Sequence, residues 1–373
     1  MITPFDEFAV HQTSMPVAHP AGGDRNFYDR YFFNGYDTSG EWFFAVALGV
    51  YPNRDVIDAA FSVVHAGVQR SVFASGRLPR DHTVSRIGPI AIEIVEPLRI
   101  NRVVVDAAHL GIGADLRWDA RTIALEEPRQ TQISGITVVQ DTTRLTQFGT
   151  WNGTIESDGD RIAVDPATSR GTKDRSWGIR WVGEPPGGAP PRTGTAPGVF
   201  YLWAPIHFDD RCTHVMLFER PDGYRWYQTA SEVPLLEPGQ QTWGNEETLR
   251  RPNAVDYALQ LRPGGRVTAG SRWTFDWGDA VEVQELSPIL DFRLTGIGYI
   301  NQKWAHGVWH GEEEVGSERW ELATLDPLLP ENYHVEQLVR VRSDRGEGIG
   351  VLEQLILGPH APTGFTDWTS GAP

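Results

Sequence analysis

The residues best suited to chemistry lie together in KDRSWGIRW, residues 173–181. If this segment is a strand, Asp174, Ser176, Gly178 and Arg180 share one face, because side chains alternate between the two faces of a strand. A carboxylic acid in an apolar setting keeps its proton more readily and can protonate a double bond. Aromatic rings, Trp above all, stabilise the cation that forms. We therefore expect Asp174 to act as a general acid or base.

Arg180 supports a second interpretation of the same face. A nearby guanidinium lowers the pKa of Asp174 and keeps its carboxyl group ionised. Ionised Asp174 would serve as a base, or it would form a buried pair with Arg180 that fixes the strand register. The opposite face is mostly apolar and holds Lys173, Arg175, Trp177, Ile179 and Trp181. If that face packs against a core or a partner domain, the polar face lines the interior of a barrel.

Two further segments hold candidate groups. His207 and Asp209 alternate together in WAPIHFDD, residues 203–210, so a hydrogen bond between them could orient His207 as a general base. A strand-end turn with a satisfied His is the alternative. His306 and His310 would share a strand face in residues 304–314, but their spacing shows no third ligand, so we expect no metal.

The composition fits a globular protein of two domains. The chain has 373 residues, of which 40% are hydrophobic and 22% charged. Its net charge of −16 argues against nucleic acid and anionic membranes as partners. Cys212 is the single cysteine, so an intramolecular disulfide is impossible and a cytoplasmic location is expected.

Targeting and cofactor motifs are missing from the sequence. The N-terminus has no signal-peptide pattern, and no stretch reaches the roughly 18 apolar residues of a membrane span. The sequence also lacks HExxH, GxSxG, CxxC and Walker A motifs, and nicotinamide or flavin fingerprints. We therefore expect no cofactor. The oligomeric state is left open, with a homodimer as one option.

The hydrophobic pattern has mostly a period of two, which indicates strands. Short strands separated by turns predict an all-β barrel or sandwich. The clearest strand-like runs are residues 41–52, 60–73, 91–106, 199–210, 212–221, 272–277, 291–300, 334–344 and 350–358. Residues 183–198 are rich in Pro and Gly and predict a linker or long exposed loop. This divides the chain into β domains at 1–182 and 199–373.

Three stretches of the sequence carry a resemblance to a known family. Residues 146–181 resemble the strand, DG turn and "[RH]-D-[HR]-[NS]-W-G" strand of the lipocalin-like hydroxyneurosporene-synthase and carotenoid-hydratase family. Residues 296–312 and 87–103 are similar to its "GYxxxxWGHG" and "VGPxxxEVxEP" stretches. This chain departs from the pattern at Lys173, where the family has an aromatic residue or His, and at Ala305, where it often has Gly. The resemblance implies two lipocalin-like antiparallel β-barrels, or strongly curved sheets, packed together.

Two functional classes follow. The first is a cofactor-independent lyase, hydratase or cyclase that acts on a hydrophobic isoprenoid-, polyketide- or steroid-like molecule. Asp174 would transfer the proton, and Arg180 and Gln147 would hold a polar substrate group. The residues expected to complete the substrate site are Arg175, Trp177, Trp203, Tyr299, Trp304 and His306. The second class is a non-catalytic binder or carrier of a hydrophobic small molecule.

Overall fold

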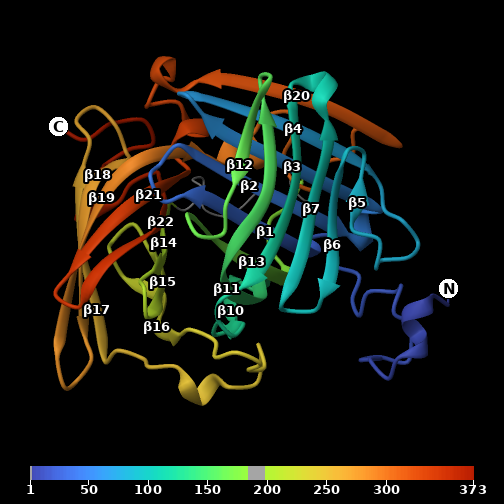
Figure 1. The fold of residues 1–373 in the computed structure, drawn as a ribbon, viewed down its shortest axis with the longest axis horizontal. Coiled ribbons are helices and arrows are strands. Elements are labelled where there is room, and N and C mark those ends of the chain that lie inside the picture. Colours follow the sequence, from blue (N-terminus) through green and yellow to red (C-terminus); the bar gives the residue numbers. More distant parts are fainter. Residues whose placement is uncertain (1, 184–197) are drawn as a thin grey trace.

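The computed structural model describes residues 2–183 and 198–373, which form an all-β fold of two curved sheets packed together (Figure 1). This confirms the fold class expected from the sequence. Within the described residues, the helices are 3₁₀ turns of three or four residues: η1 (Pro4–Glu7), η2 (Pro52–Arg54), η3 (Ala108–Leu110), η4 (Glu246–Thr248), η5 (Leu294–Ile297), η6 (Leu322–Thr324), η7 (Pro330–Asn332) and η8 (Ala361–Thr363).

The larger sheet contains fourteen strands of the described chain, and its paired neighbours run antiparallel. In spatial order they are β20 (Glu313–Glu321), β4 (Val68–Arg77), β3 (Val56–His65), β2 (Trp42–Tyr51), β1 (Phe27–Asp37), β13 (Ser169–Ile179), β11 (Thr137–Ser157), β8 (Ile112–Ala120), β7 (Ile100–Ala107), β6 (Ile90–Glu96) and β5 (Arg86–Ile87). The long strand β11 also pairs with three short strands, β9 (Leu125–Glu126), β10 (Gln130–Ser134) and β12 (Asp160–Val164).

The smaller sheet contains eight strands of the described chain and is also antiparallel. Its order is β16 (Arg225–Pro234), β15 (Arg211–Glu219), β14 (Val199–His207), β22 (Gly346–Leu357), β21 (Val335–Ser343), β19 (Val281–Arg293), β18 (Thr268–Asp276) and β17 (Ala254–Leu261). The Pro/Gly segment expected as a linker, residues 183–198, joins β13 to β14. Residues 184–197 of it lie outside the described residues.

Both sheets curl around cores of their own. In the larger sheet, β5 lies against β3 and β4 and turns the sheet towards closure. In the smaller sheet the two edge strands, β16 and β17, contact each other through Arg225. Its guanidinium donates from β16 to the Val255 carbonyl (2.7 Å) and to Asp256 (2.9 Å) on β17. Each curved sheet therefore encloses a hydrophobic core, and a third core lies between the sheets.

Strands next to the third core are apolar on both faces. In β2, Phe44 and Val46 point into the core of the larger sheet, whereas Phe43 and Ala45 join the layer between the sheets. In β14, Leu202 likewise points into the smaller sheet's own core. Burial on both sides explains why these strands are continuous hydrophobic runs, and why the solvent-facing strand β7 alternates instead.

One strand crosses between the halves of the chain. β20 comes from the C-terminal half but pairs along its length with β4, from Glu313 opposite Gly76 to Glu321 opposite Val68. Figure 1 shows β20 running along the edge of the larger sheet, far from the strands that precede it in sequence. The two halves are therefore joined by hydrogen bonds as well as by the apolar layer.

A buried carboxyl group in this layer gives a test of the packing. Glu336 on β21 is fully buried and accepts a hydrogen bond from Asn34 Nδ2 (3.1 Å) on β1. Burial, with the nearby Glu353, holds the pKa of Glu336 well above its usual value. Above pH about 4.3 the unfolded chain releases this proton while the folded chain keeps it, so stability falls as pH rises.

We expect Glu336→Gln to remove this dependence, because Gln keeps the shape without an ionisable group. The free energy of unfolding of the variant should lose less with rising pH than that of the wild type, by up to about 1.4 kcal/mol per pH unit. Denaturant unfolding at a series of pH values measures the slopes. Glu347→Gln, an exposed acid on the adjacent strand, is the control. Equal slopes for all three proteins would contradict the expectation.

Candidate functional site

A cavity of about 220 Å³ lies where the apolar layer between the two sheets gives way to polar side chains. Strands β1, β11 and β13 of the larger sheet form one wall, and β14, β15 and β22 of the smaller sheet form the other. Enclosed ligand sites measure roughly 300–1,000 Å³, so this cavity suits a compact ligand. Its aromatic lining consists of Tyr28, Phe32, Tyr201, Trp203, Phe218 and Tyr299.

Strand register arranges the first wall as a grid. Across β13, Ser176 lies opposite Arg30 on β1 and opposite Arg144 on β11. The next pocket-facing residue, Asp174, lies opposite Phe32 on β1. Facing side chains in paired strands lie about 5 Å apart at Cβ, so two guanidiniums flank one hydroxyl. The wall is polar although it belongs to a mostly apolar layer.

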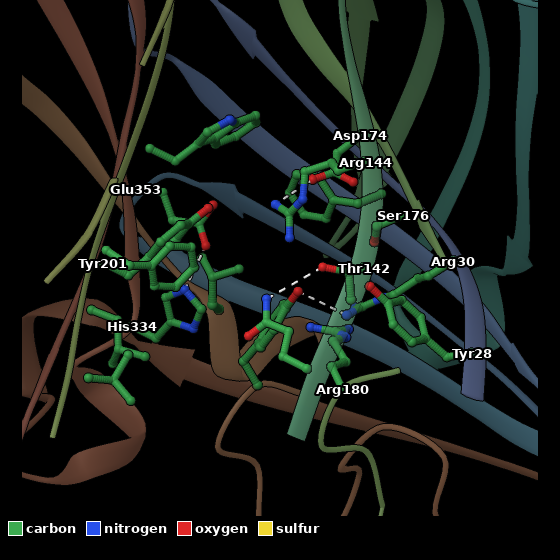
Figure 2. Close-up of a pocket in the computed structure, with 18 of the residues that line it drawn as sticks. Tyr28, Arg30, Thr142, Arg144, Asp174, Ser176, Arg180, Tyr201, His334 and Glu353 are labelled. Atoms are coloured by element: carbon green, nitrogen blue, oxygen red, sulfur yellow. Dashed lines mark hydrogen bonds and ion pairs between the residues drawn. The ribbon is translucent and has the colours of Figure 1, made fainter. Parts of the chain in front are cut away.

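Asp174 is the carboxyl group of this wall. It is 7% exposed and forms an ion pair with Arg144 (2.8 Å; Figure 2). Burial raises the pKa of Asp174 to about 6; Arg144 opposes this rise, and the nearby Glu127 and Glu353 add to it. Asp174 can therefore either give or take a proton near neutral pH.

The opposite wall carries a second acid–base pair. His334 Nε2 lies 2.6 Å from Glu353 Oε1, and Figure 2 shows both side chains across the cavity from Asp174. The other ring nitrogen, Nδ1, is buried without a hydrogen-bond partner among the described residues. If Nε2 carries the ring proton and donates a hydrogen bond to Glu353, Nδ1 is unprotonated and can accept a proton from a ligand or water.

Two arginines occupy one end of the cavity. Arg30 donates to the Tyr299 hydroxyl (2.9 Å) and lies 3.1 Å from His306 Nδ1. The guanidinium of Arg180 lies 4.6 Å from the centre of the Tyr28 ring. The partners of both arginines are neutral, since burial and Arg30 together hold the pKa of His306 well below its usual value.

A strained loop holds the Tyr299 side of the cavity. Ile300 has φ 51°, a left-handed conformation that is unfavourable for a β-branched residue. The following Asn301 ties the loop back by donating to the Thr295 carbonyl (3.1 Å) and to Glu318 (3.0 Å). Tyr299 and Ile300 both line the cavity, so the strain lies at the candidate site.

Several residues singled out in the sequence do meet in this cavity. Asp174, Ser176 and Arg180 share its wall, as the alternation of the strand predicts, and Trp203 and Tyr299 join them from the other half. The second interpretation of the sequence pairs Asp174 with Arg180, but the ion pair that Asp174 forms is with Arg144. The polar face was expected to line a barrel interior; it lines the space between the sheets, because the interior of the larger sheet is filled by its own core.

The opposite face of β13 differs from the expectation of an apolar packing surface. Lys173 points towards the core of the larger sheet, where its Nζ lies 6.0 Å from the centre of the Phe33 ring. The Nζ donates to Asn101 Oδ1 (3.2 Å) and lies 3.5 Å from the side-chain oxygen Oε1 of Gln147. Burial, with Arg175 adding to it, lowers the pKa of Lys173 to about 8. Gln147 is held by this lysine and by the Leu98 and Thr122 carbonyls, outside the cavity.

Beyond Lys173 this face of β13 emerges from the core. Arg175 pairs with Asp29 (2.6 Å), and Trp177 and Trp181 are 37% and 66% exposed. The strand continues past the packed interior, so these apolar rings have no core to enter. Gly178 was expected to allow a close approach, and the group that approaches is the backbone of β11. A Cβ at Gly178 would lie 2.1 Å from the Asp141 carbonyl oxygen.

Trp304 and His306 lie beside the main cavity, around a space of about 10 Å³. Trp304 stacks on Phe73 with ring centres 5.5 Å apart. His306 reaches the site indirectly, because its Nδ1 lies by Arg30 and its Nε2 by the Ile297 carbonyl (2.8 Å). His310 lines the same small space.

His207 and Asp209 lie elsewhere in the fold. His207 is buried between Arg121 (3.1 Å) and the Gly171 carbonyl (3.1 Å), and burial followed by Arg121 holds its pKa well below the usual value. Asp209 is exposed. The expected hydrogen bond to Asp209 is thus replaced by these contacts, and neither residue lines the main cavity.

Sequence reasoning missed Arg30, Arg144, His334 and Glu353. Arg30 and Glu353 interrupt largely apolar stretches of β1 and β22, and His334 directly precedes β21, which was the available signal. Arg144 lies in a polar stretch of β11 and gave no such signal. Their meeting depends on strand pairings between segments far apart in sequence. Within residues 2–183 and 198–373, no cluster of three or more His, Cys, Asp or Glu side chains could hold a metal ion. The described helices are all too short or too polar to cross a lipid bilayer.

Comparison with solved structures supports the fold. A protein of Nitrosomonas europaea assigned as AttH has a TM-score of 0.54 at 13% identity, covering 88% of this chain and 92% of its own. Kievitone hydratase from Nectria haematococca has a TM-score of 0.53 at 12% identity, covering 88% of each chain. At such identities the likeness shows a shared fold.

Sequence comparison gives the family. No curated protein sequence matches the chain. Membership in the hydroxyneurosporene-synthase family, suggested by the motifs, stays a prediction. Residues 2–366, nearly the whole chain, match the model of a family of unknown function, DUF8625, and the chain therefore belongs to that family.

Proposed function

We propose that the protein is a hydratase or hydro-lyase that adds water to, or removes it from, a hydrophobic small molecule held between the two sheets. The observation that carries this proposal is that Asp174 and the His334–Glu353 pair face one aromatic-lined cavity from opposite walls. Kievitone hydratase, which shares the fold, is by name a hydratase, and this supports the reaction class. Aromatic walls suit a hydrophobic skeleton, and the cavity volume of about 220 Å³ favours a compact member of the isoprenoid, polyketide or steroid-like classes.

In the hydration direction, Asp174 donates its proton to one carbon of the double bond. Its raised pKa leaves a useful protonated fraction near pH 6. The positive charge that develops on the other carbon meets the faces of Trp203, Tyr201 or Tyr299. Asp174 ends as a carboxylate paired with Arg144, which stabilises the charge left behind.

The His334–Glu353 pair activates the water. Glu353 accepts a hydrogen bond from Nε2–H of His334 and so orients the ring. The unprotonated Nδ1 then takes a proton from the water molecule while the water oxygen bonds to carbon. One C–H and one C–O bond form, and the π bond breaks. His334 then loses its extra proton to solvent and Asp174 regains one, which balances the cycle. Dehydration is the same sequence reversed.

A non-catalytic carrier is the second candidate. The 2.8 Å ion pair between Arg144 and Asp174 favours it, because a paired carboxylate can be a purely structural element. Mutation of Asp174 separates the two functions.

We expect Asp174→Asn to lower turnover by roughly 10²–10⁴-fold while ligand affinity changes by less than about tenfold, since a proton donor acts mainly on the chemical step. Native mass spectrometry of the protein from its own organism identifies the bound molecule. Turnover is then followed as gain or loss of one water.

The matched control is Asp29→Asn, which breaks a carboxylate–arginine pair on the other side of the same sheet. It should leave turnover unchanged. Normal turnover by Asp174→Asn would contradict the catalytic role, and a large fall in its melting temperature would favour the structural pair. A bound molecule that the wild type never converts would indicate a carrier.

The rate of hydration should depend on pH through Asp174. With a pKa of about 6, the protonated fraction falls roughly tenfold per pH unit above that value. We therefore expect kcat for hydration to fall above pH about 6, as Asp174 loses its proton, and kcat for dehydration, which needs the Asp174 carboxylate, to fall below that pH. Rates measured across this range in both directions provide the test. A hydration rate that increases above pH 7 would rule out Asp174 as the donor.

A further inference from the structure

At the Arg30–Arg180 end of the cavity, neither guanidinium forms an ion pair with a carboxylate of the described residues. Elsewhere in the larger sheet, Arg144 is paired with Asp174 and Arg175 with Asp29. Among the described residues, the hydrogen-bond and ring partners of Arg30 and Arg180 are instead neutral: Tyr299, His306 and Tyr28. Burying a charge without a counter-charge is costly, so an unpaired guanidinium in a cavity calls for an explanation.

Buried donors at this end also lack partners. Arg30 is only 2% exposed, and its Nε has no hydrogen-bond partner among the described residues. The same holds for Nε of Arg180 and the hydroxyl of Tyr28. In folded proteins such groups are almost always paired, so three unsatisfied groups at one end of a cavity indicate a ligand acceptor.

The nearby carboxylate does not fill this role. Asp58 lies close enough to both arginines for each of them to lower its pKa. Its oxygens, however, accept hydrogen bonds from the Gly307 amide (2.6 Å) and the Tyr51 hydroxyl (3.1 Å). The other cavity acids, Asp174 and Glu353, are bound to Arg144 and His334 respectively. The cavity therefore has a cationic end and an end that carries the acids.

We propose that the Arg30–Arg180 end is a carboxylate-binding subsite and that the natural ligand is a hydrophobic carboxylic acid. Guanidinium groups match the planar geometry of a carboxylate, and the Tyr28 hydroxyl adds a donor. Figure 2 shows Arg30, Arg180 and Tyr28 together, with Glu353 and His334 on the opposite wall. The carboxylate anchors the ligand at this end, and its hydrophobic part extends towards Asp174. The inference rests on the proposed function for the identity of the site, although binding alone can test it.

The test compares trans-cinnamate with trans-cinnamamide, which differ in charge but hardly in shape, by calorimetric titration at neutral pH. We expect the wild type to bind the carboxylate at least about tenfold more tightly than the amide. Arg180→Gln should reduce this preference to about twofold or less. Arg30→Gln should do the same and serves as a second variant in case one fails to fold.

Arg175→Gln is the matched control, because it removes the same charge from β13, five residues before Arg180, on the face away from the cavity. It should retain the full preference, and Asp174→Asn should retain it as well. Equal affinity for the two probes, no binding of either probe, or a preference that survives both cavity-arginine variants would overturn the subsite.

These results are separable from the proposed reaction. A carboxylate preference without any water addition would support the subsite and contradict the hydratase. Asp174-dependent hydration of the natural ligand with no carboxylate preference would support the hydratase and overturn the subsite.

Discussion

The outer face of the larger sheet has to be covered, and much of the molecule follows from that requirement. Strands β1 and β2 present Phe32, Tyr36 and Phe43 on the side away from their own core. Such a face exposed to water would be a large apolar patch. The smaller sheet covers it with Trp203 and its neighbours, so each sheet completes the burial of the other. The pairing of β20 with β4 reinforces this arrangement by joining C-terminal residues to the N-terminal sheet.

The candidate site is a polar interruption in that apolar layer. Along β1 the cavity-facing residue after Phe32, towards the N-terminus, is Arg30, and the residues opposite them on β13 are Asp174 and Ser176. At these positions polar side chains replace the apolar contacts between the two sheets. Burying these charges opposes folding unless they are paired. Arg144 and Asp174 meet that condition, and the arginines at the other end do not. The large apolar cores on either side can tolerate this local loss of stability, which is what a functional site requires.

The sequence predicts the β class and one face of the site, and the physical reason is local. Period-two alternation is a property of each strand by itself, so it correctly groups Asp174, Ser176 and Arg180. The partners of these residues depend on register. Arg144 is about thirty positions earlier and Glu353 belongs to the other sheet, and no local pattern aligns either with Asp174. The same limit explains the outward-facing Trp177, because the point at which a strand leaves its core is set by neighbouring strands.

The location of the cavity links ligand binding to the association of the halves. Its acid on one wall comes from β13 and its His–carboxylate pair from β22 and the residue before β21, so neither sheet has the complete set of groups. A ligand that contacts both walls binds only the assembled form and therefore stabilises it, in proportion to the logarithm of its concentration over its dissociation constant. A carboxylate at the arginine end would add to this by relieving the repulsion between two buried cations. Arg30 and Arg180 would then weaken the contact between the sheets when the cavity is empty and strengthen it when a carboxylate is bound.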